Sequence, residues 1–195
     1  WLGAPAPVAS APAGATLRAT GCPLPGQRVG DDGTLQSDAP GDMAGFALGD
    51  ARAEPLAGFS VAARVLARED YRHDREARYA PVDLALAWGR MRDDHVLSQL
   101  DISQSGRFYH YRWQGEPPLP PDELIRSSAN MHQIPADDTE RAALDRIDAD
   151  DRVRIDGWLV QVRASDGWQW RSSLTREDSG AGACELIYVC AVTRL

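Results

Sequence analysis

Proline and glycine are distributed unevenly along the chain, and this limits how much of it can form a core. Seven of the thirteen prolines and ten of the seventeen glycines lie in residues 1–58, where the only aromatic residues are Trp1 and Phe46. Such a segment buries too little apolar surface to offset the entropy lost on ordering. We therefore predict an extended arm or linker over residues 1–57 and a globular domain over residues 58–195. Within the arm, only residues 43–48 are expected to dock on the domain.

Strand patterns dominate the predicted domain. Residues 59–65 alternate apolar and polar side chains, residues 100–113 indicate a strand pair turning at Ser105-Gly106, and residues 184–193 are apolar on both faces. Within residues 153–162 the alternation of apolar and polar residues shifts by one position at Asp156-Gly157, which indicates a β-bulge. The run from Ser165 to Gly167 predicts a tight hairpin turn.

Short helices are expected between these strands. Residues 81–88 read as a buried helix with Pro81 at its first position and Gly89 as its stop. Asp137 is expected to cap a second helix, with Glu140 at the capping-box spacing. Helical turns are also expected near residues 93–97 and 122–126. The predicted class is β-rich α+β: a small antiparallel, OB-like, partly closed barrel preceded by the arm. An open antiparallel sheet with helices on one face is the alternative.

The charge of the chain narrows the function classes. The formal net charge is −8, and every basic residue except the four histidines is arginine. An acidic chain is unsuited to general phosphate binding, so no nucleic-acid partner is expected, and single-strand binding by an OB-like barrel would need a basic groove. The absence of lysine excludes Schiff-base chemistry and a Walker-type lysine. No cofactor is expected. No metal site is expected either, because His73-Asp74 and Asp93-Asp94-His95 lack a recognised ligand spacing.

The cellular location is inferred from the arm. No apolar run reaches the roughly 18 residues of a membrane span, and the chain begins at Trp1, so we expect a missing N-terminal signal or anchor. A linker composition then favours a cell-envelope location, periplasmic and tethered to the inner membrane. Cys184 and Cys190 lie too far apart along one strand to pair, whereas one of them would reach Cys22 if the arm folds back. Two buried cysteines and a tail thiol are the favoured interpretation.

The first candidate site is the segment from Ser127 to Pro135. Asn130 and His132 share one side of an extended backbone, and histidine exchanges a proton near neutral pH. Together with Glu185 they are the candidate catalytic residues. A buried connector whose polar side chains bond to loop backbone is the structural alternative. Cys184 as a nucleophile beside His132 and Asn130 is disfavoured, because no helix N-terminus lowers its pKa.

The second candidate site is the connection over residues 170–185. It concentrates hydroxyl, guanidinium and glycine residues that suit an anion, and its candidate ligand-binding residues are Trp170, Arg171, Ser172, Ser173 and Arg176. A plain strand connection, with glycines supplying turn geometry, is the alternative. Trp158, Trp168 and Trp170, with the aromatic residues of 108–111, would line a stacking platform, although aromatic residues at strand spacing are more often core.

Several of these segments also resemble a protein family. Arg68–Tyr71, Pro81–Leu86, Ser128–His132 (SANMH) and Trp170–Ser173 with the GxGxCE pattern ending at Glu185 are similar to an uncharacterised family of small proteobacterial envelope proteins. The resemblance covers roughly residues 71–185 and leaves the arm outside. It implies a signal-bearing or single-pass anchored protein and supplies no catalytic residues.

Two functions follow from these patterns. The preferred one is a non-enzymatic, envelope-tethered module that binds a protein partner or a small anionic ligand. The alternative is a hydrolase-like enzyme that acts on an anionic substrate with His132 as general base. Whether the chain is an enzyme depends on whether the Asn130/His132 segment and the 171–185 connection meet in a pocket.

Overall fold

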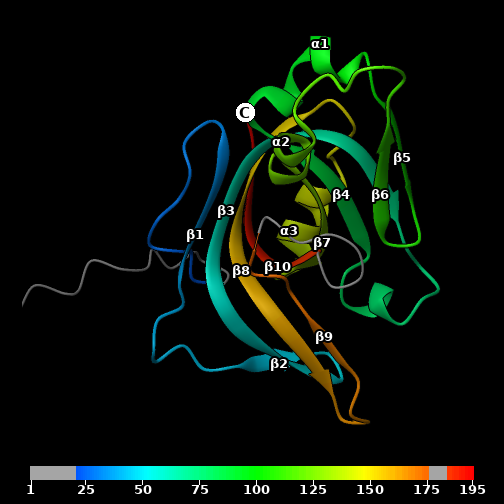
Figure 1. Cartoon of the computed structure of the whole chain (residues 1–195). Helices are drawn as coiled ribbons and strands as arrows, with labels where there is room; N and C mark the ends of the chain where they lie inside the picture. Colours follow the sequence, from blue (N-terminus) through cyan, green and yellow to red (C-terminus); the bar gives the residue numbers. More distant parts are fainter. Residues whose placement is uncertain (1–20, 176–183) are drawn as a thin grey trace, which may run out of the picture.

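The computed structural model describes residues 21–175 and 184–195. Ten strands make up almost half of these ranges: β1 (Gly33–Asp38), β2 (Phe46–Leu48), β3 (Ala51–Asp70), β4 (Val82–Ala87), β5 (Asp101–Ser105), β6 (Phe108–Arg112), β7 (Ser128–Pro135), β8 (Arg152–Ala164), β9 (Gln169–Arg171) and β10 (Glu185–Arg194). The helices between them are short: α1 (Asp94–Leu97), α2 (Pro121–Arg126) and α3 (Asp138–Leu144), with 3-10 turns η1 (Glu76–Arg78) and η2 (Gly89–Arg92). The predicted β-rich α+β class is confirmed (Figure 1).

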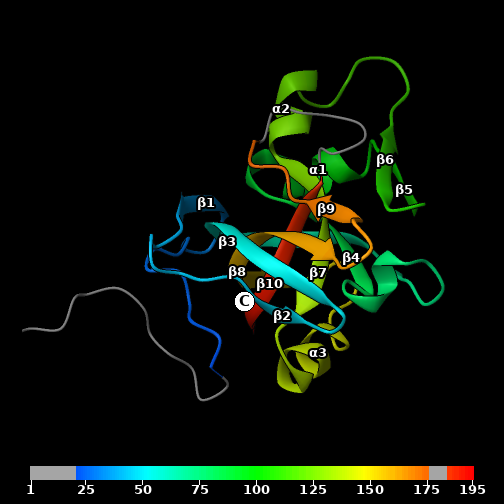
Figure 2. The same ribbon diagram turned by 90° about the horizontal axis from the view of Figure 1, so that it is seen from below.

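Five strands form a sheet that partly closes on itself. They hydrogen-bond in the order β3-β4-β7-β10-β8, and β8 pairs back with β3. Only β7 and β10 are parallel within this ring, and α3 connects β7 to β8. This order is that of an OB-like five-stranded Greek key, but the ring is only partly closed and is not a complete barrel. The β5–β6 hairpin forms a separate sheet beside it (Figures 1 and 2).

β3 joins the parts of the sheet because it is long enough to change partners. Residues 51–64 pair with β8, residues 57–62 pair with β1, and residues 64–70 pair with β4. Register shifts at 55–57 and 65–67 accompany these changes of partner, as expected of bulges that bend a strand. The predicted boundary between residues 57 and 58 therefore falls inside one continuous strand.

The segment before β3 belongs to the sheet more fully than its composition predicted. Cys22 and Leu24 are buried, the Trp158 indole Nε1 donates to the Pro23 carbonyl at 2.7 Å, and β1 adds to the edge of β3. β2 lies in the 43–48 segment that was expected to dock. Residues 1–20 of the predicted arm lie outside the described residues.

The helix predicted over residues 81–88 is wrong, because this segment is strand β4. All six residues of β4 are buried, and the strand lies between β3 and β7. A short apolar run that is covered on both faces has no alternating polar side, so its pattern does not separate strand from helix.

Other local predictions are confirmed, with one exception. The Asp137 carboxylate accepts from the Thr139 and Glu140 backbone N–H groups and caps α3. Gly167 has a positive φ in the β8–β9 turn. The bulge predicted within residues 153–162 is wrong in its strand: β8 pairs with β3 without a shift at Asp156-Gly157, and the register shift lies in the facing strand, between Val189 and Ala191 of β10. There a Cβ at position 157 would lie 2.0 Å from the Tyr188 carbonyl oxygen, so only glycine fits.

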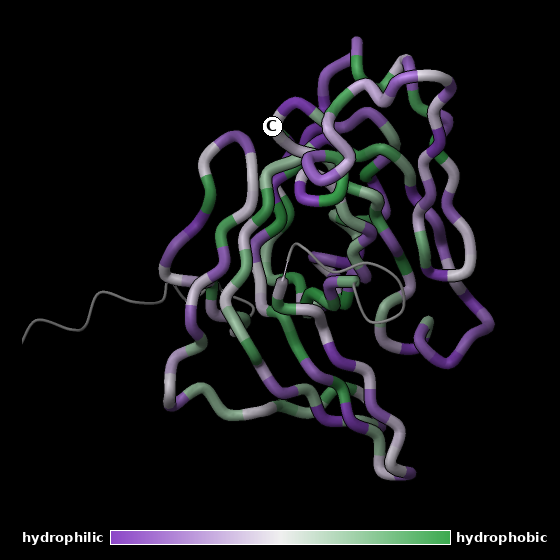
Figure 3. The backbone as a smooth tube through the Cα atoms, in the orientation of Figure 1, coloured by the Kyte–Doolittle hydropathy of each residue, from purple (hydrophilic) through white to green (hydrophobic). Residues whose placement is uncertain are grey.

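Within the described residues, two of the three apolar clusters lie on opposite faces of the ring strands, and the third lies under η2, α1 and α2 and includes Met91 and Leu124. One draws on all five ring strands and includes Phe59, Leu84, Met131, Ile155 and Ile187. The other lies over β7, β8 and β10 and includes Cys22, Ile134, Trp158, Leu186 and Cys190. Figure 3 shows hydrophobic residues along these central strands and hydrophilic residues along the outer connections.

Candidate functional site

Asp83 of β4 and Asn130 and His132 of β7 are three buried polar side chains on one face of the sheet. Asp83 faces His132 across the two strands, and Asn130 lies two residues before His132. Asp83 is fully buried, and His132 and Asn130 are 3% and 5% exposed. Side chains alternate along a strand, so Asn130 and His132 share a face, as their spacing predicts. The extended segment, for which a buried connector was the structural alternative, is the central strand β7 of the sheet.

Asp83 is the centre of a network that we call the Asp83 cluster (Asp74, Asp83, Arg107, Asn130 and His132). Its Oδ1 accepts from Arg107 Nη1 at 2.9 Å, and its Oδ2 accepts from Asn130 Nδ2 at 3.1 Å. His132 Nδ1 lies 2.8 Å from the same Oδ1, but without hydrogen-bond geometry, so proximity rather than a directed bond links the two. A buried carboxylate needs such partners, since an unpaired one is very costly.

Arg107 reaches this cluster from the tip of the β5–β6 hairpin. Gly106 and Arg107 form its two-residue turn with φ values of 58° and 70°, the signs that a type I′ turn requires. The guanidinium donates to both Asp74 carboxylate oxygens at 2.8 Å and to the Ala80 carbonyl at 2.9 Å. It also lies 3.9 Å from the centre of the Tyr71 ring, a cation–π contact.

These contacts change the pKa values of the paired groups. The Arg107 hydrogen bonds lower the pKa of Asp74. Burial opposes the charge on Arg107, yet the hydrogen bond with Asp74 and the charge of Asp83 outweigh it and raise its pKa. Both groups therefore stay ionised near neutral pH, and the tip of the hairpin is fixed to the sheet by charge-assisted bonds.

The two segments singled out from sequence meet at this tip. The Arg107 carbonyl accepts from Asn130 Nδ2 at 2.9 Å, and Cys184 Sγ lies 3.8 Å from the same oxygen. The Trp170 ring packs 4.8 Å from the His132 ring, centre to centre. Gln104 Nε2 adds a bond to Asn130 Oδ1 at 2.6 Å. The two segments therefore contact each other within a packed network around the tip of the β5–β6 hairpin.

The other predicted ligand-binding residues serve the connection itself. Ser173 N donates to the Cys184 carbonyl and Leu186 N donates to Ser172 Oγ, both at 3.0 Å, which ties the ends of the connection together. Arg171 Nη1 donates to Gln161 Oε1 at 2.9 Å, away from His132. Glu185 is buried in β10 beside Met131. Arg176 lies outside the described residues.

Sequence reasoning missed Asp74, Asp83 and Arg107. Asp83 left a usable signal, because a single carboxylate inside the apolar run 82–86 must find a buried partner. Arg107 left a weaker one, since it directly follows the glycine of a predicted turn. Neither pattern indicates that the hairpin folds across β4 and β7.

The cysteines also differ from the favoured interpretation. Cys22 and Cys190 form a disulfide with Cα atoms 5.5 Å apart, so the segment before β1 is covalently attached to β10. Cys184 takes no part in it. Within residues 21–175 and 184–195, no three or more histidine, cysteine, aspartate or glutamate side chains are grouped to hold a metal ion. In the same ranges no helix has the length and hydropathy of a membrane span.

A pocket of about 380 Å³ lies beside the cluster, between three connections. We call it the turn pocket; its lining residues are Asp50, His73, Asp74, Arg75, Arg78 and residues 164–166. Arg75 Nη2 donates to both Asp166 oxygens at 2.7 and 2.8 Å, which connects two of the walls. Tyr79 OH donates to Asp50 Oδ1 at 2.7 Å. Asp74 belongs to both the pocket and the cluster.

The structure thus has a closed polar network, the Asp83 cluster, and beside it an open, charged pocket, the turn pocket.

Comparison of the chain with models of protein families, with curated proteins and with solved structures finds no match.

Proposed function

We propose that this chain is a non-enzymatic binding module of the cell envelope that holds a small ligand or a protein partner with its exposed turns. The observation that supports this most is the closure of the Asp83 cluster. Asp83 contacts Arg107, Asn130 and His132 at once, and Trp170 packs on His132. Asn130 bonds to the hairpin at Gln104 and Arg107, and His132 is buried between Asp83 and Trp170, so neither candidate faces an open pocket.

A periplasmic module, tethered to the inner membrane through a segment N-terminal to the domain, is the proposed location. Disulfides persist in oxidising compartments and are rare in the cytosol. The Cys22–Cys190 bond therefore supports a position outside the cytoplasm. The proline- and glycine-rich composition of residues 1–20 suits a linker to a membrane anchor.

A hydrolase that uses His132 as general base is the alternative. The 2.8 Å approach of His132 Nδ1 to Asp83 favours it, because a carboxylate beside one ring nitrogen leaves the other to act as a base. The position of His132, 3% exposed beneath Trp170, weighs against it.

Two measurements test the proposal. Cell fractionation of the full protein, with proteolysis after outer-membrane permeabilisation, should place the domain in the periplasm; protection of the domain in spheroplasts would refute the location.

Hydrolysis of p-nitrophenyl acetate and p-nitrophenyl phosphate should be the same for the wild type and His132→Gln, while His132→Gln lowers the unfolding free energy. Turnover that disappears in a folded His132→Gln variant would establish the hydrolase instead.

A further inference from the structure

The turn pocket combines hydrogen-bond donors and acceptors in nearly balanced charge. We propose that it binds a neutral polyhydroxylated ligand, a sugar unit of an oligosaccharide. This inference rests on the proposed binding function and names the ligand class for it.

The pocket is held open by bonds between its walls. Arg75 of the β3–β4 connection bridges to Asp166 of the β8–β9 turn, and its guanidinium lies 4.7 Å from the centre of the Trp168 ring. Tyr79, from the same connection, bonds to Asp50 of the β2–β3 turn. Because each wall is fixed to another wall, little ordering entropy is lost when a ligand enters.

The carboxylates of the pocket remain ionised acceptors. The Tyr79 hydroxyl lowers the pKa of Asp50, the Arg107 guanidinium lowers that of Asp74, and the Arg75 guanidinium lowers that of Asp166. Arg78, whose side chain is 67% exposed and only 3.6 Å from Asp50 Oδ2, provides donors at the rim with His73 and Ser165.

The charge balance selects between ligand classes. Each carboxylate of the lining is paired with a guanidinium group, Asp50 with Arg78, Asp74 with Arg107 and Asp166 with Arg75. A small ion of either sign would therefore have to compete with one of these pairs. Adjacent sugar hydroxyls both donate and accept, which matches alternating carboxylates and guanidinium groups without adding charge. A volume of about 380 Å³ is that of a small-ligand site.

The place of the pocket in the fold agrees with this. The connection between the first two ring strands, β3 and β4, lies beside the connection that follows β8. In OB folds the corresponding loops bind oligonucleotides or oligosaccharides. Asp50, Asp74 and Asp166 disfavour the phosphate backbone of an oligonucleotide and leave the sugar class.

The test is isothermal titration of the disulfide-bonded protein with maltotetraose, cellotetraose and chitotetraose, and separately with inorganic phosphate. We expect one of the tetrasaccharides to bind. Asp50→Asn and Arg78→Ala should each weaken that binding by about tenfold, which equals about 1.4 kcal/mol. Both side chains are mostly exposed, so the variants should keep the wild-type thermal midpoint.

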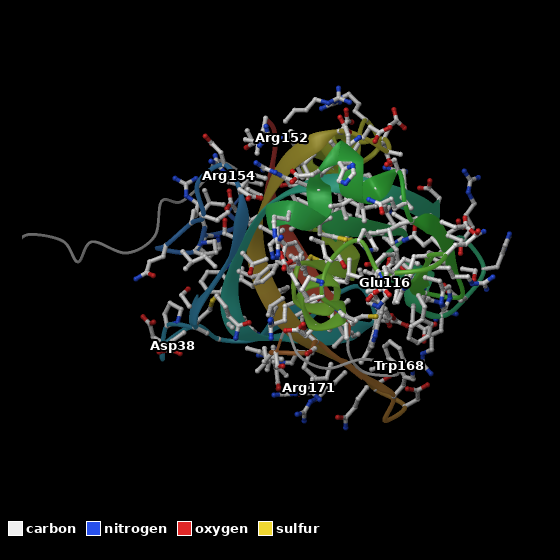
Figure 4. All side chains as sticks on the ribbon, turned by 45° about the horizontal axis from the view of Figure 1, so that its top comes forward. Asp38, Glu116, Arg152, Arg154, Trp168 and Arg171 are labelled. Carbon is white, nitrogen blue, oxygen red and sulfur yellow. A yellow bond between two sulfur atoms is a disulfide. The ribbon has the colours of Figure 1, made fainter. Side chains whose placement is uncertain are left out.

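Matched controls separate the pocket from general charge effects. Asp38→Asn and Arg112→Ala change exposed residues of β1 and β6 and should bind as the wild type does. Figure 4 shows Asp38 on a different edge of the molecule from Trp168. Phosphate binding that exceeds the sugars, or no saccharide binding at millimolar concentration, would overturn the sugar inference. Equal loss in the control variants would also overturn it. None of these results changes the fractionation and hydrolysis outcomes that decide the proposed function.

Discussion

Removing the Cys22–Cys190 disulfide should produce a large loss of stability. The bond joins residues 168 apart in sequence, so it closes a loop of nearly the whole described chain. In the chain-entropy treatment, a loop of that length stabilises the folded state by about 5 kcal/mol at 25 °C. Both cysteines are buried, and alanine is therefore the replacement that adds no buried hydroxyl.

Urea unfolding followed by tryptophan fluorescence measures this effect. For a domain of this size the urea dependence is about 2 kcal/mol per molar, so the midpoint of Cys22→Ala/Cys190→Ala should fall by roughly 2.5 M. Wild-type protein treated with a reductant should unfold near the double variant. Cys184→Ala, which leaves the disulfide intact, should unfold near the oxidised wild type.

A midpoint unchanged to within roughly 0.5 M would refute the reasoning. It would mean that the segment from Cys22 to β1 stays attached to β10 through other contacts, or that the two cysteines are not paired in solution. Counting thiols under denaturing conditions distinguishes these cases, since the disulfide leaves one thiol and its absence leaves three.

Other substitutions test the Asp83 cluster, the close strand contact and the acid response. Arg107→Ala should cost about 3–5 kcal/mol of unfolding free energy, because it leaves the buried Asp83 without its cation. Gly157→Ala should cost at least about 3 kcal/mol, because its Cβ meets the β10 backbone, whereas Gly41→Ala, with open space around it, should be near neutral. Asp74 has a lowered pKa, so its contribution is present above its unfolded pKa of about 3.9 and is lost as pH falls through the lower folded value; Asp74→Asn should flatten that acid limb.

Each of these expectations has a contradicting result. Loss of less than about 1 kcal/mol in Arg107→Ala would mean that Asp83 finds another partner or takes up a proton. Equal stability of Gly157→Ala and Gly41→Ala would show that β10 moves aside easily. An acid limb of unfolding, measured by circular dichroism, that is as steep in Asp74→Asn as in the wild type would assign it to other carboxylates.

The sequence predicted the β-rich class and most local elements because alternation, capping and turn residues are local signals. It placed the Asp137 cap, the turn at Gly167 and the hairpin at Gly106 correctly. It misassigned β4, because a strand buried on both faces carries no alternation. The segment before β3 was predicted to be an arm from its average composition. Average composition contains no information on a disulfide partner such as Cys190 or on the packing of Leu24 against the sheet.

The candidate site was predicted only in part, for a related reason. Asn130 and His132 were recognised because two unusual polar residues lie close in sequence. Asp83 and Arg107 come from segments on either side of η2 and α1, and their meeting depends on how the hairpin crosses β4 and β7. Such long-range pairing follows from tertiary structure and leaves little trace in local spacing.

The covalent link between Cys22 and Cys190 also determines where mechanical load would enter the domain. A pull on the chain before Cys22 reaches the sulfur bridge first and passes into β10, four residues before that strand ends at Arg194. When the opposing force acts at the C-terminal end, the polypeptide from Pro23 to Val189 lies inside the closed loop and is bypassed by the covalent path. Strands β1 to β9 and the turn pocket therefore lie outside the covalent path that joins the segment before Cys22 to the C-terminal end of β10.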